Sequence, residues 1–136
     1  MNMITQGSGT EADPWHLKTP SLASAFQAWR DEGKAALVVQ VGSTRLSYQL
    51  CCIVDLQAML IARGDWVALG NADEGKPVQE GSVEAWARDV GNPVGGYYGL
   101  RKGYRGRFGT YVPPVLELLG RAEVEHGARG NRMRAL

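Results

Sequence analysis

Three consecutive segments in the first half of the chain have apolar patterns that fit β-strands, and the third alternates cleanly. The segments cover residues 26–30, 35–41 and 44–50. In the third segment Leu46, Tyr48 and Leu50 fall on one face and polar residues fall on the other, as a half-buried strand requires. Turn-forming residues separate the segments, so the pattern predicts an antiparallel β-meander. The first segment has a helical alternative, because Leu22, Phe26 and Trp29 also fit helical spacing.

A helical repeat follows the meander. Its apolar residues recur at three- and four-residue steps, at Ile53, Leu56, Met59 and Leu60. Arg63 late in the repeat and Gly64 directly after it are typical of the C-terminal end of a helix. The pattern predicts a helix that packs on the meander and ends at Gly64.

The middle of the chain is predicted to be mostly loop. Residues 66–69 fit a short strand, and residues 70–81 are polar and contain a proline. Ser82 is suited to cap a short helix that ends at Gly91-Asn92-Pro93. The apolar face of that helix would be formed by Val83, Trp86 and Val90.

The C-terminal end is predicted to form a short helix over residues 112–119 and then a β-hairpin. With residues 127–130 in the hairpin loop, the opposed pairs are His126 with Asn131, Glu125 with Arg132, Val124 with Met133, Glu123 with Arg134, and Ala122 with Ala135. Charged pairs share one face and apolar pairs the other, which favours this register. A short helix followed by a basic hairpin is similar to the last half of a winged helix.

These elements predict one α+β domain over residues 1–136, in which residues 1–12 are flexible. The N-terminal part is an antiparallel β-meander with a packed helix, and the C-terminal part is a short helix plus a β-hairpin. One arrangement open to the C-terminal part is a winged-helix-like end. The chain has 136 residues, of which 44% are apolar, enough for one core. No apolar run is long enough to cross a membrane and no targeting segment is visible, so we expect a cytoplasmic protein. Adjacent Cys51 and Cys52 suit neither a disulfide nor a zinc site, and no metal or cofactor is expected.

Charge is distributed unevenly along the chain. Residues 1–100 carry 7 basic and 11 acidic side chains, whereas residues 101–136 carry 8 basic and 3 acidic ones. A basic end of this kind is able to meet nucleic acid or an acidic partner, and it is equally able to be a solvated face.

Residues 95–111 form the candidate functional surface, because five aromatic and four basic residues alternate there with six glycines. Arginine pairs with phosphate, aromatic faces stack on bases, and glycine permits close approach of a ligand. The candidate anion-binding residues are Arg101, Lys102, Arg105, Arg107 and Arg129. The candidate stacking or interface residues are Tyr97, Tyr98 and Tyr104. The hypothesis is contact with DNA or RNA without sequence specificity, which alanine at Arg105 and Arg107 should abolish without unfolding the protein.

Two other classes of function stay open. Tyrosine and arginine also dominate protein interfaces, so the segment equally fits a protein partner, or a homo-oligomeric adaptor joined through a sheet edge. A metal-dependent nuclease is the remote alternative, because Asp65 and the Glu74-Gly75-Lys76 triplet loosely match the acid and Glu-x-Lys arrangement of such enzymes. Gly75 and Pro77 place the triplet in a turn, whereas that chemistry needs a rigid strand.

Three blocks of sequence carry a resemblance to known proteins. They are Gly9 to Trp15, Gly64-Asp65-Trp66 through Glu74, and Asn92 to Gly96 with Asn131 to Ala135. Through them most of the chain resembles a group of small uncharacterised bacterial proteins, mainly of actinobacterial type. The resemblance implies a bacterial, cytoplasmic, single-domain protein and brings no activity or site residues with it.

Overall fold

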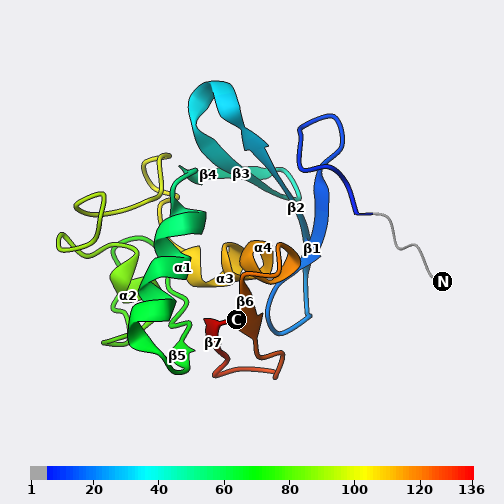
Figure 1. The fold of residues 1–136 in the computed structure, drawn as a ribbon. Coiled ribbons are helices and arrows are strands. Elements are labelled where there is room, and N and C mark those ends of the chain that lie inside the picture. Colours follow the sequence, from blue (N-terminus) through cyan, green and yellow to red (C-terminus); the bar gives the residue numbers. More distant parts are fainter. Residues whose placement is uncertain (1–5) are drawn as a thin grey trace.

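A computed structural model describes residues 6–136 and shows an α+β fold with two antiparallel sheets. Helices lie between the larger sheet, built from the N-terminal part of the chain, and the smaller sheet that contains the C-terminal hairpin (Figure 1). The predicted fold class is therefore confirmed. None of the helices in this described part is both long and apolar enough to cross a membrane.

The larger sheet is the predicted meander with one further strand. Its strands, in spatial and chain order, are β1 (Trp15–Lys18), β2 (Ala25–Asp31), β3 (Ala36–Val41) and β4 (Thr44–Gln49). The helical alternative around Phe26 is wrong, because residues 25–28 of β2 pair with β1 and residues 27–31 pair with β3. Strand β1 was not predicted, since it has only four residues and lies between Pro14 and Pro20.

The inner face of the meander carries the alternating apolar residues. Leu46 and Tyr48 of β4 are buried in the main core, as predicted, together with Leu37 and Val39 of β3. Helix α1 (Cys52–Arg63) covers this core and ends at Gly64, whose φ of 67° and N–H bond to the Leu60 carbonyl close the helix as predicted.

The middle of the chain contains β5 (Val67–Ala68) and α2 (Val83–Trp86). Ser82 caps α2 as predicted, accepting a bond of 3.1 Å from the Ala85 N–H. The predicted helical face is wrong at Val90, which is 82% exposed because α2 ends at Trp86. A further short helix, α3 (Phe108–Tyr111), was not predicted.

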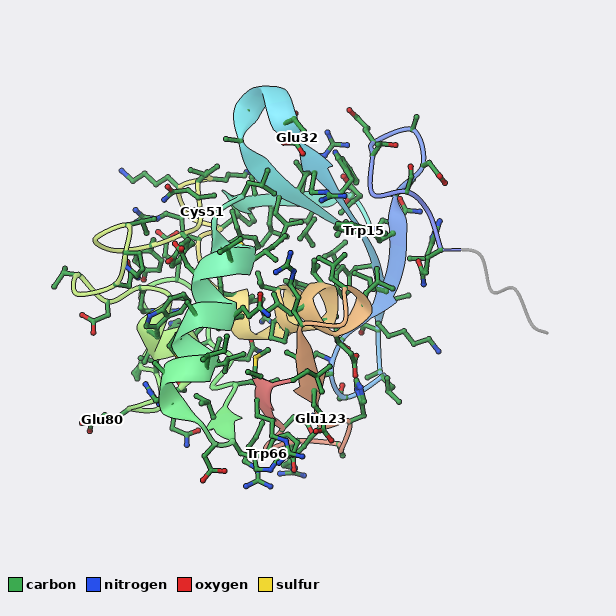
Figure 2. The ribbon with its side chains drawn as sticks, viewed as in Figure 1. Trp15, Glu32, Cys51, Trp66, Glu80 and Glu123 are labelled. Atoms are coloured by element: carbon green, nitrogen blue, oxygen red, sulfur yellow. The ribbon has the colours of Figure 1, made fainter. Side chains whose placement is uncertain are left out.

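The smaller sheet completes the C-terminal end. Strands β6 (Ala122–Val124) and β7 (Arg132–Ala135) pair in the predicted register, with Val124 opposite Met133. Strand β5 adds to the other edge of β7, which gives the order β5-β7-β6. Trp66 and Glu123 lie at this end of the molecule (Figure 2).

The helix before the hairpin is α4 (Pro113–Leu118), and its first four residues are buried. It contacts α1, α3, β1 and β6. The likeness to a winged helix is therefore limited to the order of elements, because this helix packs in the core and presents no recognition face.

The N-terminal segment meets the meander through residues 6–9, whereas residues 1–5 lie outside the described residues. The Gln6 side chain exchanges two hydrogen bonds with the backbone of His16 on the outer edge of β1. The Gly9 carbonyl accepts a bond of 2.9 Å from the Arg30 N–H. The flexibility expected for residues 1–12 stays a prediction.

Candidate functional site

The glycine-rich segment 95–111 packs against the acidic loop 70–81. Arg105 holds Glu74 through two side-chain bonds, Nε to Oε1 at 2.9 Å and Nη2 to Oε2 at 3.0 Å. The backbone N–H groups of Gly103 and Arg105 donate to the same Oε1 atom at 3.1 and 2.8 Å. The bonds from Arg105 lower the pKa of Glu74 to about 2. One of the five predicted cations is thus engaged within the protein.

Arg107 makes a second link to the loop. Its Nε donates to Asp73 Oδ1 at 2.6 Å, and its backbone N–H donates to the Ala72 carbonyl at 2.8 Å. The hydrogen bond to Asp73 raises the pKa of Arg107. Both side chains stay about half exposed, at 47% and 54%.

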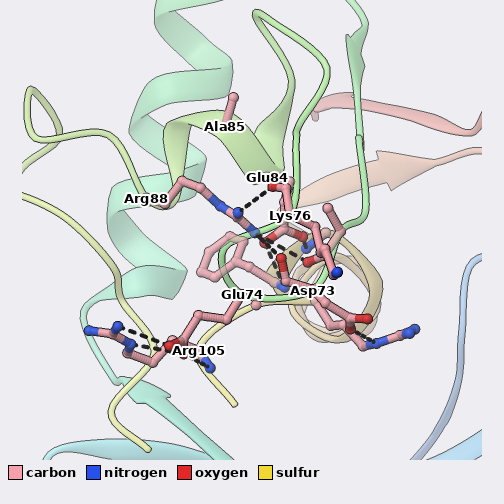
Figure 3. Close-up of polar contacts among 12 residues, drawn as sticks. Asp73, Glu74, Lys76, Glu84, Ala85, Arg88 and Arg105 are labelled. Carbon is pink, nitrogen blue, oxygen red and sulfur yellow. Dashed lines mark hydrogen bonds and ion pairs between the residues drawn. The ribbon is translucent and has the colours of Figure 1, made fainter. Parts of the chain in front are cut away.

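Arg88 also contacts this loop (Figure 3). We refer to Arg88, Arg105 and Arg107, which together hold loop 70–81, as the clamp. Its terminal nitrogens donate to the carbonyls of Ala72, Asp73 and Lys76 at 3.1 to 3.3 Å. The Tyr97 ring lies 5.1 Å from the Arg88 guanidinium and 4.6 Å from that of Arg105. Because the Tyr97 hydroxyl also accepts a bond from the Gly75 N–H, Tyr97 is part of the clamp.

Glu84 connects the clamp to the core. The sequence analysis did not identify Glu84 as a residue of the site. This carboxylate is 1% exposed and accepts bonds from the N–H groups of Phe108 and Gly109 and from Arg88 Nη2. Burial raises the pKa of Glu84. The available signal was the four-residue spacing of Glu84 and Arg88, which is typical of a helical ion pair.

A glycine is needed at position 106 because the backbone there lies very close to the acidic loop. A Cβ atom there would lie 2.3 Å from the Glu74 backbone nitrogen and 2.7 Å from the Ala72 carbonyl oxygen. The Gly106 carbonyl also accepts a bond of 2.8 Å from the buried Tyr48 hydroxyl. The glycine-rich segment thus packs tightly at this point.

Tyr98 is a core residue. It is 0% exposed, and its hydroxyl donates to Asp55 Oδ2 at 2.8 Å. Burial, and after it the bond to Asp55, raises the pKa of Tyr98. The Tyr98 carbonyl accepts from the Gln49 N–H, so this segment covers part of the outer edge of β4. The outer strands of the smaller sheet are β5 and β6, and β1 is the other outer strand of the larger sheet.

Four of the predicted site residues are exposed and lie outside the clamp. Arg101 sits over the Tyr104 ring, 4.0 Å from its centroid, and donates to the Arg45 carbonyl at 2.7 Å. Tyr104 is 43% exposed, Lys102 follows Arg101 on the surface, and Arg129 is exposed in the hairpin loop. Within residues 6–136 neither Lys102 nor Arg129 makes an ion pair.

Two adjoining grooves lie beside Arg129 and Tyr104, whereas Arg101 and Lys102 line neither groove. The larger, of about 780 Å³, lies between the β1–β2 loop, the segment after β5, α3 and the hairpin loop, and its charged lining is Arg107, Arg129 and Arg132. No acidic side chain of the described residues lines it. The smaller groove, of about 400 Å³, is lined by Tyr104, Asp73, Glu74 and apolar residues of the meander. Val41, Arg107 and Tyr111 line both.

His126 stabilises one wall of the larger groove through two hydrogen bonds. Its Nδ1 lies 2.8 Å from the Pro20 carbonyl and its Nε2 lies 2.6 Å from Glu117 Oε2. Burial disfavours the charged ring, but the bonds to Glu117 and Pro20 outweigh it and raise the pKa of His126. Since both partners are acceptors, the ring satisfies them together only as the imidazolium.

The nuclease alternative depends on convergent carboxylates. Glu74 is held by Arg105, and Asp65 accepts a bond from the Trp66 N–H. Across residues 6–136 no group of three or more histidine, cysteine, aspartate and glutamate side chains is placed to hold a metal ion.

The fold and the grooves define a small α+β protein with an arginine-lined surface groove beside a clamped acidic loop. The chain belongs to a family of unknown function, DUF6855, whose model matches residues 7–136. Searches of curated proteins and of solved structures find no significant match.

Proposed function

We propose that this protein binds single-stranded nucleic acid without sequence specificity, with the phosphates in the larger groove. The observation that carries the proposal is the charge of that groove, whose ionised lining residues are three arginines. A cleft lined by one sign of charge attracts ligands of the opposite sign.

The ion pairs of two of these arginines leave donors free. Arg107 uses its Nε for Asp73, and Arg132 uses Nε and Nη2 for Glu125. A guanidinium has five N–H donors, so the remaining terminal nitrogens are able to bind phosphate while the pairs stay intact. Arg129 offers its whole guanidinium.

A flexible single strand fits this surface better than a duplex. The larger groove adjoins the smaller one at Arg107, and the exposed side chain of Tyr104 lines the smaller one. Unstacked bases of a single strand are free to stack on an aromatic side chain, whereas bases within a duplex are not. A protein partner, or a second copy of this chain, is the alternative that arginine and tyrosine also allow.

We further infer that the protein acts in a bacterial cytoplasm. Both cysteines are free, Cys51 on the surface and Cys52 in the core, and free thiols are usual in a reducing compartment. The bacterial assignment rests on the resemblance of the sequence alone.

The test is fluorescence anisotropy of a labelled random-sequence strand of about twelve nucleotides, within the site size of a small binding module. Three arginine contacts predict micromolar binding whose logarithmic salt slope is about −2, from about −0.7 per phosphate on a single strand. Arg129→Ala should weaken binding severalfold and make the slope shallower by about 0.7. Lys34→Ala is the matched control, because Lys34 is an exposed cation that lines neither groove.

Two outcomes would count against this function. Absence of binding at low salt removes it, and equal effects of the two substitutions remove the groove as the site. Binding of the strand that survives high salt would instead indicate that aromatic stacking, and not phosphate contact in the groove, provides the affinity.

A further inference from the structure

We propose that the smaller groove is a nucleobase subsite that prefers bases with an exocyclic amino group. This inference rests on the proposed function, because the larger groove must hold the phosphates. Arg107 lines both grooves, so a nucleotide whose phosphate reaches Arg107 from one side would have its base on the other.

Tyr104 supplies the stacking surface. Its ring lines the groove, is 43% exposed, and is held by the Arg101 guanidinium at 4.0 Å. The backbone N–H of Tyr104 donates to the Arg101 carbonyl at 2.8 Å, which closes a tight turn around Lys102 and Gly103. A ring that is already held in place loses little entropy when a base stacks on it.

Apolar residues form another part of the lining and suit the edge and face of a base. Val41, Leu46 and Tyr111 contribute it, and they belong to the rigid meander and to α3. The volume of about 400 Å³ lies within the usual range for small-molecule sites.

Asp73 supplies the selectivity. Its Oδ1 accepts from Arg107, and its Oδ2 accepts no hydrogen bond from the described residues. The neighbouring Glu74 already accepts four. An ionised carboxylate only accepts, so Asp73 would bind the amino group of cytosine, whereas the carbonyl that thymine has at the same ring position would repel it.

The experiment compares three labelled strands of equal length: oligo-dC, oligo-dT and an abasic strand with the same phosphates. We expect oligo-dC to bind about tenfold more tightly than the abasic strand, from stacking on Tyr104, and severalfold more tightly than oligo-dT. Tyr104→Ala should bring oligo-dC within about twofold of the abasic strand, while Tyr104→Phe keeps the difference. Asp73→Asn, which adds a donor, should equalise oligo-dC and oligo-dT.

Failure of this inference is distinguishable from failure of the proposed function. If the abasic strand does not bind at low salt, the phosphate groove itself is wrong. If the abasic strand binds and oligo-dC binds no more tightly, the base subsite alone is overturned. A Tyr104→Ala variant that folds normally and keeps the full preference for oligo-dC would also overturn it.

Discussion

Replacing Gly106 by alanine tests whether the glycine-rich segment supports the acidic loop by close packing. The new Cβ would lie 2.3 Å from the Glu74 nitrogen, 2.6 Å from the Asp73 carbonyl carbon and 2.7 Å from the Ala72 oxygen. All three are backbone atoms, so a change of side-chain rotamer does not relieve the clash. Overpacking of this kind costs about 1–3 kcal/mol in free energy of unfolding.

Movement of the loop would add to that cost. The bond from the Arg107 N–H to the Ala72 carbonyl, at 2.8 Å, crosses the point of contact. Its loss is worth about 1 kcal/mol, and a displaced Gly106 carbonyl would leave the buried Tyr48 hydroxyl without its acceptor, for about 1–3 kcal/mol more. We therefore expect Gly106→Ala to destabilise the protein by at least about 3 kcal/mol.

Urea unfolding, followed by tryptophan fluorescence, measures this difference. Gly33→Ala is the matched control, because its Cβ would meet no atom closer than the 3.6 Å contact with Asp31 Oδ1, and it should change stability by less than about 0.5 kcal/mol. The reasoning is refuted if Gly106→Ala lowers the unfolding free energy by less than about 1 kcal/mol. That result would mean that the segment moves freely away from the loop.

Three further predictions concern the ionisable contacts. Because the folded pKa of Glu74 is lowered from 4.5 to about 2, its ion pair stabilises the protein above pH 4.5 and loses that effect as pH falls toward 2. The stability difference between wild type and Glu74→Gln in urea should therefore shrink over that range. The pKa of His126 is raised from 6.5, so its contribution is complete below pH 6.5 and is lost as pH rises through the folded pKa; His126→Gln should flatten stability curves above pH 6.5. Tyr98→Phe keeps the ring but removes the bond to Asp55, and thermal unfolding should show a loss of about 1–2 kcal/mol.

The elements that were predicted correctly from the sequence are those that depend on local patterns of residues. The β6–β7 register follows from charge and size, since Glu123 opposite Arg134 and Val124 opposite Met133 satisfy both faces at once. The alternation in β4 and the glycine after α1 are equally local. Val90 shows the limit of periodicity, because apolar spacing continued beyond the residue where the backbone leaves the helix.

The partners of the arginines could not be predicted in this way. Arg105 pairs with Glu74 and Arg107 with Asp73 across 31 and 34 residues of chain. The composition of residues 95–111 is the same whether its cations face solvent or an acidic loop, and only the tertiary fold decides. The sequence signal for these pairs was the excess of acidic residues in 1–100 and of basic residues in 101–136. The sequence analysis interpreted the basic residues as a site for an anionic ligand.

These pairs change how the binding hypothesis must be tested. Alanine at both Arg105 and Arg107 was expected to abolish binding without unfolding the protein. In the structure either change removes support from the loop that carries Asp73, so lost binding would not separate a ligand contact from a displaced loop. Arg129 is the sharper probe, because it lines the larger groove from an exposed loop. In the proposed site Arg107 would act in two ways, positioning the loop through Nε and binding phosphate with the nitrogens that the pair leaves free. Its replacement by lysine, which keeps the charge but not the five-donor geometry, should weaken binding and the clamp together.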